Sequence, residues 1–369
     1  MNNQTKLSGV QLTFFIIQTQ IGVGILGLPF NVYLKSKQDA WIAVLLAGLL
    51  VQAVIMILWL LGRRFPSKSL FEYSKILLGK ITGTFLNCGY ILYALLVTAL
   101  ILMYSTKIIK MWVLIFTPKW IIMFLLIATA MYLASEDVIG ISNIYVVVSS
   151  LIFFLLVISI IVLVTYPVEF RYLFPMGQSG VLGWLKGANE AYFSMLGFEL
   201  LLILYPHFKQ NEEKAILIHV TVANITVTII YAFMTIVSIV TFSPTEIDIV
   251  PQPVLYFVKS LYLQIVERID LVFVSLWVVN VITSLTSYLF FATEGTSFFL
   301  RKVKKIKRTI LPIIFGVMGL IIALMVKFDQ MEVYNKAVIY MSYAFVFFIP
   351  LMLLGISLVF KKHEREKQQ

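Results

Sequence analysis

Three glycines interrupt an apolar run near the start of the chain, and they point to a binding site made of backbone groups. Gly22, Gly24 and Gly27 lie inside residues 14–34, a run of membrane-spanning length. Each glycine weakens a helix by roughly 1 kcal/mol relative to alanine. An unwound turn in hydrocarbon is tolerated where it is buried in protein or lines a cavity. Because transporter-type folds bind small polar solutes at such broken helices, we predict a solute site at Gly22 and Gly24.

Backbone polarity indicates what this site would bind. A half-helix that begins near Ile25 presents free N–H groups and a partial positive charge, which suit the carboxylate of an amino acid. Glycine at positions 22 and 24 keeps side chains away from that surface, so a ligand can touch the backbone. The alternative is that the glycines only allow close helix packing, as small residues do in membranes, and packing is the favoured interpretation for Gly27.

A second apolar run, residues 186–204, is interrupted in the same way and is expected to complete the site. Ser194 and Gly197 lie near its middle. A half-helix that ends near Ser194 would present free carbonyl groups to the ligand ammonium. Glu190 and Glu199 lie in the same run, and a carboxylate at the bilayer centre costs about 2.5–3.5 kcal/mol on insertion scales. Such carboxylates usually face a cavity or a partner group.

The role of Glu199 has several interpretations at this stage. Its carboxylate pairs with the ligand ammonium, hydrogen-bonds the backbone of the unwound turn, or holds a proton whose release is coupled to binding. A structural hydrogen bond to the first or eighth span is the remaining alternative. Glu190 lies nearer the aqueous end, where we expect a solvated or vestibule residue.

Other polar residues inside apolar runs are candidates for lining the cavity or for coupling. Gln18 and Gln20 flank the first interruption, where hydrogen bonding to a neighbouring helix is the alternative to a ligand or gating role. Tyr90 and Tyr93 share a face with Asn87 in the third span, and an interfacial position is the alternative there. Four residues at helical spacing form a polar stripe in the eighth span: Trp277, Asn280, Ser284 and Ser287.

Composition places these residues in a polytopic helical membrane protein. Of 369 residues, 60% are hydrophobic and 13% are charged, and the mean hydropathy is +0.96. Soluble domains carry about 25% charged residues. Apolar runs of about 20 residues recur along the chain, as spanning helices require. We predict ten spans, at 9–34, 41–61, 81–104, 120–134, 143–165, 186–204, 215–241, 266–299, 309–326 and 336–360.

The ten spans form two halves of similar length, residues 9–165 and 186–360, and each half opens with a glycine-interrupted helix. An odd number of spans per half inverts the topology of the second half. This pattern predicts an all-α, LeuT-like 5+5 inverted repeat with the solute near the midplane. We assign one membrane domain over residues 1–369, with amphipathic helices at 69–79 and 252–264, a loop at 166–185 and a basic tail at 361–369.

Lys and Arg residues set the expected orientation. With the N-terminus inside, the cytoplasmic segments carry 18 of these residues and the opposite side carries 11, so both termini are expected in the cytoplasm. The basic cluster at 301–308 falls on the cytoplasmic side, where it anchors the topology or contacts anionic lipid. Since the net charge of +11 comes from short loops, we do not expect nucleic acid as a partner.

The sequence lacks a constellation that would carry catalysis or bind a metal. His207, His219 and His363 have no ligand spacing, and no phosphate-binding loop or Ser-His-Asp set occurs. The single cysteine, Cys88, lies in an apolar run and is interpreted as packing. We therefore expect no catalytic residues, no metal and no cofactor.

Four segments in combination resemble one known family. They are IGVGILGLPF (21–30), SLFEYSKILLGK (69–80), SMLGFELLLILYP (194–206) and VERIDLVFVSLWV (266–278). In order, and over essentially the whole chain, they are similar to the B subunit of spore germinant receptors. This is the endospore germination permease family within the amino acid–polyamine–organocation superfamily.

The resemblance implies a protein of the bacterial spore inner membrane. It would sense a nutrient germinant, commonly a small amino acid, and trigger germination together with an A-type subunit and a lipoprotein C-type subunit. In sodium-coupled relatives of the superfamily, span-eight hydroxyls and span-one carbonyls coordinate a cation, which would involve Ser284 and Ser287 here. Two functions stay open: a receptor subunit, to which a gated water or ion conduit would also correspond, and an active amino-acid permease with proton or cation coupling.

Overall fold

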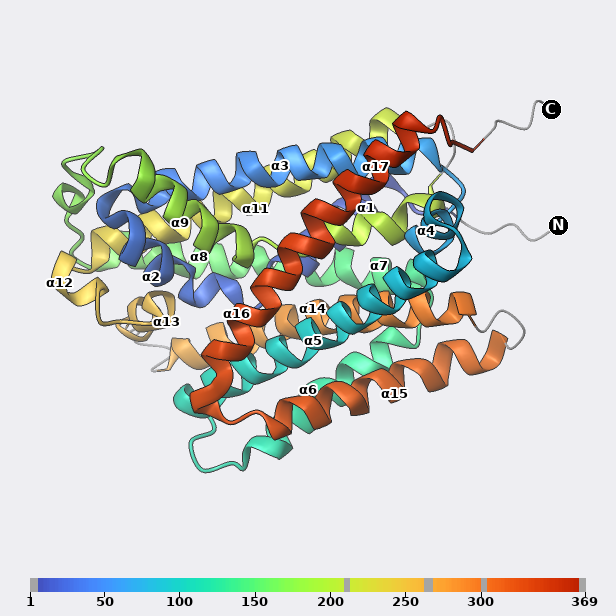
Figure 1. The fold of residues 1–369 in the computed structure, drawn as a ribbon. Helices are drawn as coiled ribbons and strands as arrows, with labels where there is room; N and C mark the ends of the chain where they lie inside the picture. Colours follow the sequence, from blue (N-terminus) through green and yellow to red (C-terminus); the bar gives the residue numbers. More distant parts are fainter. Residues whose placement is uncertain (1–5, 209–212, 262–267, 300–303, 365–369) are drawn as a thin grey trace.

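The computed structural model describes residues 6–208, 213–261, 268–299 and 304–364, and no strand occurs among them. Helix α1 begins and α17 ends at one end of the bundle, beside α4, while α12 and α13 lie at the opposite end (Figure 1). In chain order the α-helices are α1 (Gly9–Gln20), α2 (Gly24–Ser36), α3 (Ala40–Arg64), α4 (Leu70–Leu78), α5 (Lys80–Trp112), α6 (Lys119–Ala134), α7 (Val138–Val148), α8 (Ser150–Thr165), α9 (Gly180–Ser194), α10 (Leu201–Leu204), α11 (Glu213–Thr241), α12 (Pro244–Ile247), α13 (Pro253–Lys259), α14 (Ile269–Phe299), α15 (Lys304–Met325), α16 (Met331–Ser342) and α17 (Ile349–Val359).

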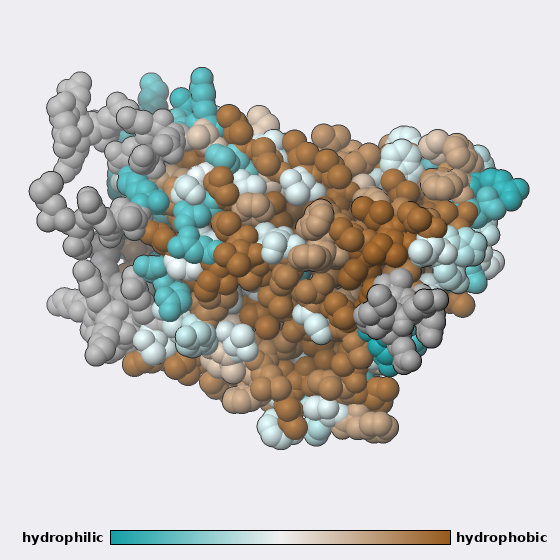
Figure 2. Space-filling model, turned by 180° about the vertical axis from the view of Figure 1, so that it is seen from behind, coloured by the Kyte–Doolittle hydropathy of each residue, from teal (hydrophilic) through white to brown (hydrophobic). Residues whose placement is uncertain are grey.

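The surface matches that of a membrane protein. Figure 2 shows a broad apolar belt around the middle of the molecule, with hydrophilic residues toward both ends. Helices occupy all the predicted spans, but the count of ten stays a prediction because several of these helices are short. Six segments of the described chain are long and apolar enough to cross a membrane: Gly24–Arg64, Lys80–Trp112, Val138–Thr165, Glu213–Thr241, Ile269–Phe298 and Phe328–Val359.

Some helix boundaries differ from the prediction because helices extend past the apolar runs. α9 begins at Gly180, so the predicted loop 166–185 is wrong over residues 180–185, which are helical. α7 begins at Val138, where the Asp137 carboxylate accepts a hydrogen bond from the Gly140 N–H at 2.8 Å. The amphipathic helix predicted at 69–79 is confirmed as α4. The one predicted at 252–264 is present as α13, and its last three residues lie outside the described residues.

Both predicted interruptions are present, and they lie together at the centre of the bundle. Residues 21–23 separate α1 from α2, and residues 195–197 separate α9 from the 3₁₀ turn η3 (Phe198–Leu200). α2 packs on α9, while α1 packs on α11, α7 and α14. The α2 and α9 half-helices therefore form one packed pair, and α1 continues from it through the core.

A buried carboxylate fastens the outer corner of this pair. Asp39 lies in the 3₁₀ turn η1 (Lys37–Asp39) between α2 and α3 and is 1% exposed. Its oxygens accept hydrogen bonds from the N–H groups of Gly177 and Ser179, the Ser179 hydroxyl and the Trp184 indole, at 2.7–3.1 Å. Asp39 thus joins the end of α2 to the segment that leads into α9.

We predict that Asp39→Ala lowers the melting temperature of the purified protein by several degrees. The substitution leaves three partly buried donor residues without this acceptor, and the loss of an acceptor costs roughly 1–3 kcal/mol for a fully buried donor and less where water can reach it. Thermal unfolding in one detergent measures the change. Asp248→Asn is the matched control, because the Asp248–Lys37 ion pair on the same end of the molecule is exposed and should contribute little. Equal melting temperatures for the two variants would contradict the prediction.

Candidate functional site

The two interrupted helices contact each other directly at their breaks. The Gln20 side-chain amide Nε2 donates to the Met195 carbonyl at 2.7 Å. Gly197 has a φ of 129°, in the left-handed region, and a Cβ there would lie 2.9 Å from the Thr19 carbonyl carbon. A side chain at position 197 would therefore strain the backbone and push the second break away from the end of α1.

Gly24 and Ser194 face each other across this junction. A Cβ at Gly24 would lie 2.8 Å from Ser194 Cβ and 3.1 Å from its Cα, and a Cβ at Gly22 would lie 2.5 Å from the Ser284 hydroxyl. Gly24 therefore allows a close approach to the backbone of α9 that a side chain would prevent, whereas a side chain at Gly22 would displace the Ser284 hydroxyl. Packing and ligand access are compatible here, because both glycines also line the cavity described below.

Side chains from distant helices hydrogen-bond the carbonyl ends of the breaks. The Tyr231 hydroxyl of α11 lies 2.8 Å from the Gln20 carbonyl and 3.2 Å from the Ser194 carbonyl. The Trp277 indole of α14 donates to the Gly22 carbonyl at 3.1 Å. The Ser284 hydroxyl lies 3.1 Å from the Thr19 carbonyl and 3.2 Å from that of Gln18. These contacts supply donors where the helical bonding of α1 and α9 stops.

The amino-terminal end of α2 is different. Within the described part of the chain no side chain caps it, and the first N–H groups of a helix have no partner within the helix. Gly24 lines the cavity, whereas the Ile25 side chain is buried in the wall. The carbonyl ends are therefore hydrogen-bonded to side chains, while the amide end opens toward the cavity. This arrangement favours an anionic group of a ligand at Gly24.

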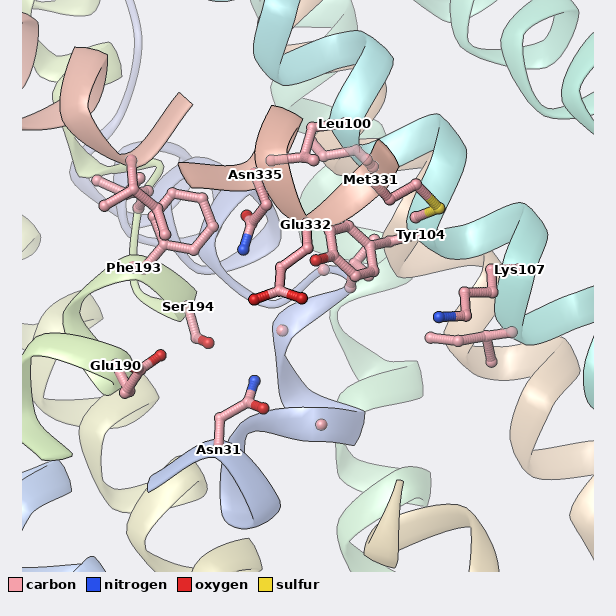
Figure 3. A pocket seen from close by; sticks show the side chains of 18 of the residues that line it. Asn31, Leu100, Tyr104, Lys107, Glu190, Phe193, Ser194, Met331, Glu332 and Asn335 are labelled. Carbon is pink, nitrogen blue, oxygen red and sulfur yellow. The ribbon is translucent and has the colours of Figure 1, made fainter. Parts of the chain in front are cut away.

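A cavity of about 840 Å³ extends from this junction toward the end of the molecule that carries α13. Figure 3 shows side chains of α2, α5, α9 and α16 around it, with Ser194 near the break and Glu190, Asn31 and Glu332 farther out. Its volume lies in the range of small-molecule sites, about 300–1,000 Å³. Of the predicted site residues it is lined by Gly22, Gly24, Ser194, Gln20 and Ser284.

Glu199 lies behind the cavity wall and is 1% exposed. Its Oε1 accepts hydrogen bonds from the Tyr288 hydroxyl at 2.7 Å and the Tyr93 hydroxyl at 3.2 Å, and its Oε2 accepts from the Gly197 N–H at 2.6 Å. Two of the interpretations of Glu199 match these contacts: hydrogen bonding to the backbone of the unwound turn and hydrogen bonding to the eighth span. Together they hold the turn that follows the second break.

The remaining predicted residues connect helices around the junction, except Asn280, whose Nδ2 donates to the Leu276 carbonyl within α14. Gln18 is buried and bridges two helices, since Nε2 donates to the Ser149 hydroxyl and Oε1 accepts from Thr283. Ser287 contacts the hydroxyls of Thr19 and Tyr145. Three others lie outside the cavity lining: Tyr90, Tyr93 and Asn280.

Sequence reasoning missed several polar residues at the junction. Tyr231, Thr283 and Tyr288 lie inside apolar helices and hydrogen-bond the breaks or the residues beside them. A hydroxyl deep within a predicted span was the available signal, because a buried hydroxyl needs a partner.

Comparison with known proteins places this geometry in context. A family model described as "Spore germination protein" matches residues 6–333. Spore germination protein GerQB of Bacillus cereus is 28% identical over 295 residues, which cover 79% of each chain. Spore germination protein YndE of Bacillus subtilis (strain 168) is 25% identical over 84% of this chain and 86% of the relative. Spore germination protein A2 of the same organism is 25% identical over 96% of this chain and 95% of the relative.

Solved structures show the fold. MhsT in complex with L-phenylalanine superposes with a TM-score of 0.70 at 14% identity, covering 97% of this chain and 90% of that chain. A Na⁺-coupled sialic acid symporter superposes with a TM-score of 0.67 at 13% identity, covering 96% and 81%. The predicted LeuT-like helical fold is thereby confirmed.

We predict different effects for two substitutions of Glu199. Glu199→Gln keeps one oxygen for the Gly197 N–H and turns its amide toward tyrosine hydroxyls that can accept, so the melting temperature should stay close to wild type. Glu199→Leu leaves the Gly197 N–H and both hydroxyls without this acceptor and should lower it by several degrees. Thermal unfolding measures both variants. If glutamine is as damaging as leucine, the negative charge or its proton matters and the hydrogen-bonding account is wrong.

Proposed function

The chain belongs to the spore germination protein family, and from this premise we propose that it is the membrane subunit of a spore germinant receptor. The subunit binds a nutrient germinant, a small amino acid, and signals germination together with A-type and C-type subunits. It lies in the inner membrane of the spore with both termini in the cytoplasm. The observation that carries this proposal is the meeting of two broken helices at one cavity.

The ligand's carboxylate binds at the start of α2. The first-turn N–H groups near Gly24 and Ile25 supply donors and the positive end of a helix dipole, and no side chain of the described residues caps them. The ammonium lies on the opposite side, near Ser194 and the free Oε1 of Gln20, both of which belong to residues that line the cavity. A zwitterion thus matches the amides at the start of α2 and the side-chain oxygens of Ser194 and Gln20.

Binding acts on a pair of half-helices. Gly24 of α2 and Ser194 of α9 lie within contact distance and both line the cavity, so a ligand beside this contact touches both helices at once. A shift of this pair is the two-state element that the partner subunits read, and the ligand favours the state in which its contacts are better.

An active amino-acid permease is the second candidate, favoured by the shared fold of MhsT with L-phenylalanine. Both functions use the same pocket, and transport would additionally require the cavity to open alternately to both sides. In a cation-coupled permease, Ser284 and Ser287 of α14 supply cation-binding hydroxyls beside the end of α1. In this structure both make direct hydrogen bonds to that helix.

We predict that Gly24→Val abolishes the germinant response while the protein stays in the membrane. The valine side chain overlaps Ser194, whose backbone Cα lies 3.1 Å from the position of the new Cβ, and it covers the N–H groups. Spores that carry the variant with its partner subunits are tested against a panel of amino acids, with immunoblotting of the membrane fraction. Gly355→Val of α17 is the matched control, because no atom lies within 4 Å of the position of its new Cβ and Gly355 is outside the cavity lining. An unchanged dose–response of Gly24→Val would contradict the placement of the ligand site at Gly24.

We predict no concentrative uptake by the isolated chain. Proteoliposomes that contain the purified protein are given radiolabelled amino acids under a sodium gradient and, separately, a proton gradient, with protein-free liposomes as the control. A receptor subunit binds ligand and accumulates none inside. Robust accumulation driven by either gradient would contradict the receptor function and support the permease function.

A further inference from the structure

One carboxylate of the cavity has no role in the account above. Glu190 lies on α9 four residues before Ser194, so it is on the same face one helical turn farther from the break. It lines the cavity and is half-buried. Glu190 makes no hydrogen bond or ion pair with any residue of the described chain, which leaves both carboxylate oxygens available to a ligand.

The opposite wall also presents acceptors at this level. Figure 3 shows Glu332 and Asn335 of α16 and Tyr104 of α5 across the cavity from Glu190. The Asn335 Oδ1 is buried and has no hydrogen-bond partner. Glu332 forms an ion pair with Lys336, but both side chains are well exposed, at 77% and 64%, so this pair contributes little.

The cations of the lining form no ion pair with Glu190 among the described residues, although Lys35 exerts a Coulombic attraction on its carboxylate. Lys35 lies at the outer end of α2, and no ion pair joins it to Glu190 within 4 Å among the described contacts. Lys107 lies beyond Tyr104 on the α5 wall, away from Glu190 (Figure 3). The middle of the cavity therefore presents the carboxylates of Glu190 and Glu332 and the unpartnered Asn335 Oδ1 to a ligand.

The space between the break and Glu190 suits an extended side chain. Gly27 leaves the α2 wall bare between Gly24 and Asn31. Glu190 and Ser194 are separated by about 6 Å along the helix axis, a length similar to that of a four-methylene chain. At the deep end of the cavity, the Gln20 side chain is 2% exposed. Its Nε2 donates to the Met195 carbonyl, and its Oε1 has no hydrogen-bond partner among the described residues.

We propose that the ligand is an amino acid whose side chain ends in a cation, and that Glu190 determines this specificity. The inference rests on the proposed function, because it places the ligand's carboxylate at Gly24 and its α-ammonium near Gln20. The side-chain cation then reaches Glu190, with Asn335 and Tyr104 on the facing wall. A charge-assisted hydrogen bond to a carboxylate supplies the selectivity.

The test compares two ligands with the same carbon chain. The full-length protein in lipid nanodiscs is titrated with L-lysine and with L-norleucine, which lacks the terminal ammonium. We expect L-lysine to bind the wild type at least roughly tenfold more tightly, in line with the strength of charged hydrogen bonds. Glu190→Gln should weaken the binding of L-lysine by a similar factor and leave the affinity for L-norleucine unchanged. Glu169→Gln, at an exposed ion pair with Arg171 outside the cavity, is the control that should alter neither.

Two results would overturn the inference. One is equal affinity of the wild type for both ligands, and the other is an equal loss of affinity for both ligands in Glu190→Gln. A Gly24→Val variant in the same assay separates this failure from that of the proposed function. If neutral amino acids bind the wild type and not Gly24→Val, the site stands and only the cationic specificity is wrong. If no amino acid binds in a Gly24-dependent manner, both proposals fail.

Discussion

Backbone groups at a helix break inside a membrane must find hydrogen-bond partners within the protein, because lipid supplies none. In this structure the requirement is met unevenly. Donors from α11 and α14 reach the carbonyl ends: Tyr231 serves both breaks, and Trp277 and Ser284 serve the first. The first turn of α2 receives no side-chain cap. The site follows from this difference, since the polar groups left for a ligand at the break are chiefly amides.

The same contacts make the two half-helices behave as one body. At the deep end, the Tyr231 hydroxyl and the Gln20 amide tie α1 to the end of α9. At the outer end, Ser36 donates to the Gly183 carbonyl at 2.9 Å, and Asp39 fastens the segment before α9. A ligand at Gly24 therefore acts on a pair that is braced at both ends. Such a pair shifts between discrete packings more readily than it deforms, which is what a sensor requires.

Much of this could be predicted from the sequence because it depends on local features. The glycines of two apolar runs predicted helix breaks, and both breaks, at Gly22–Gly24 and at Gly197, are present. The partners of the breaks could not be predicted, because they lie far away in sequence. Tyr231 is 211 positions from Gln20, and Tyr288 is 89 positions from Glu199. Only the packing of α11 and α14 against the core brings these groups together.

The start of α9 shows a different limit. Its first turns contain glycine and follow Pro175, so composition favours a loop, while Asp39 from another helix fixes the preceding segment. Tertiary hydrogen bonds thus override local propensity there.

The most direct test of the account is a cryo-electron microscopy structure of the full-length protein with a bound amino acid. The account predicts a carboxylate oxygen within about 3 Å of the backbone nitrogens of Gly24 and Ile25, between the breaks of α1–α2 and α9–η3. Density for the ligand elsewhere, or a carboxylate turned away from the start of α2, would contradict it.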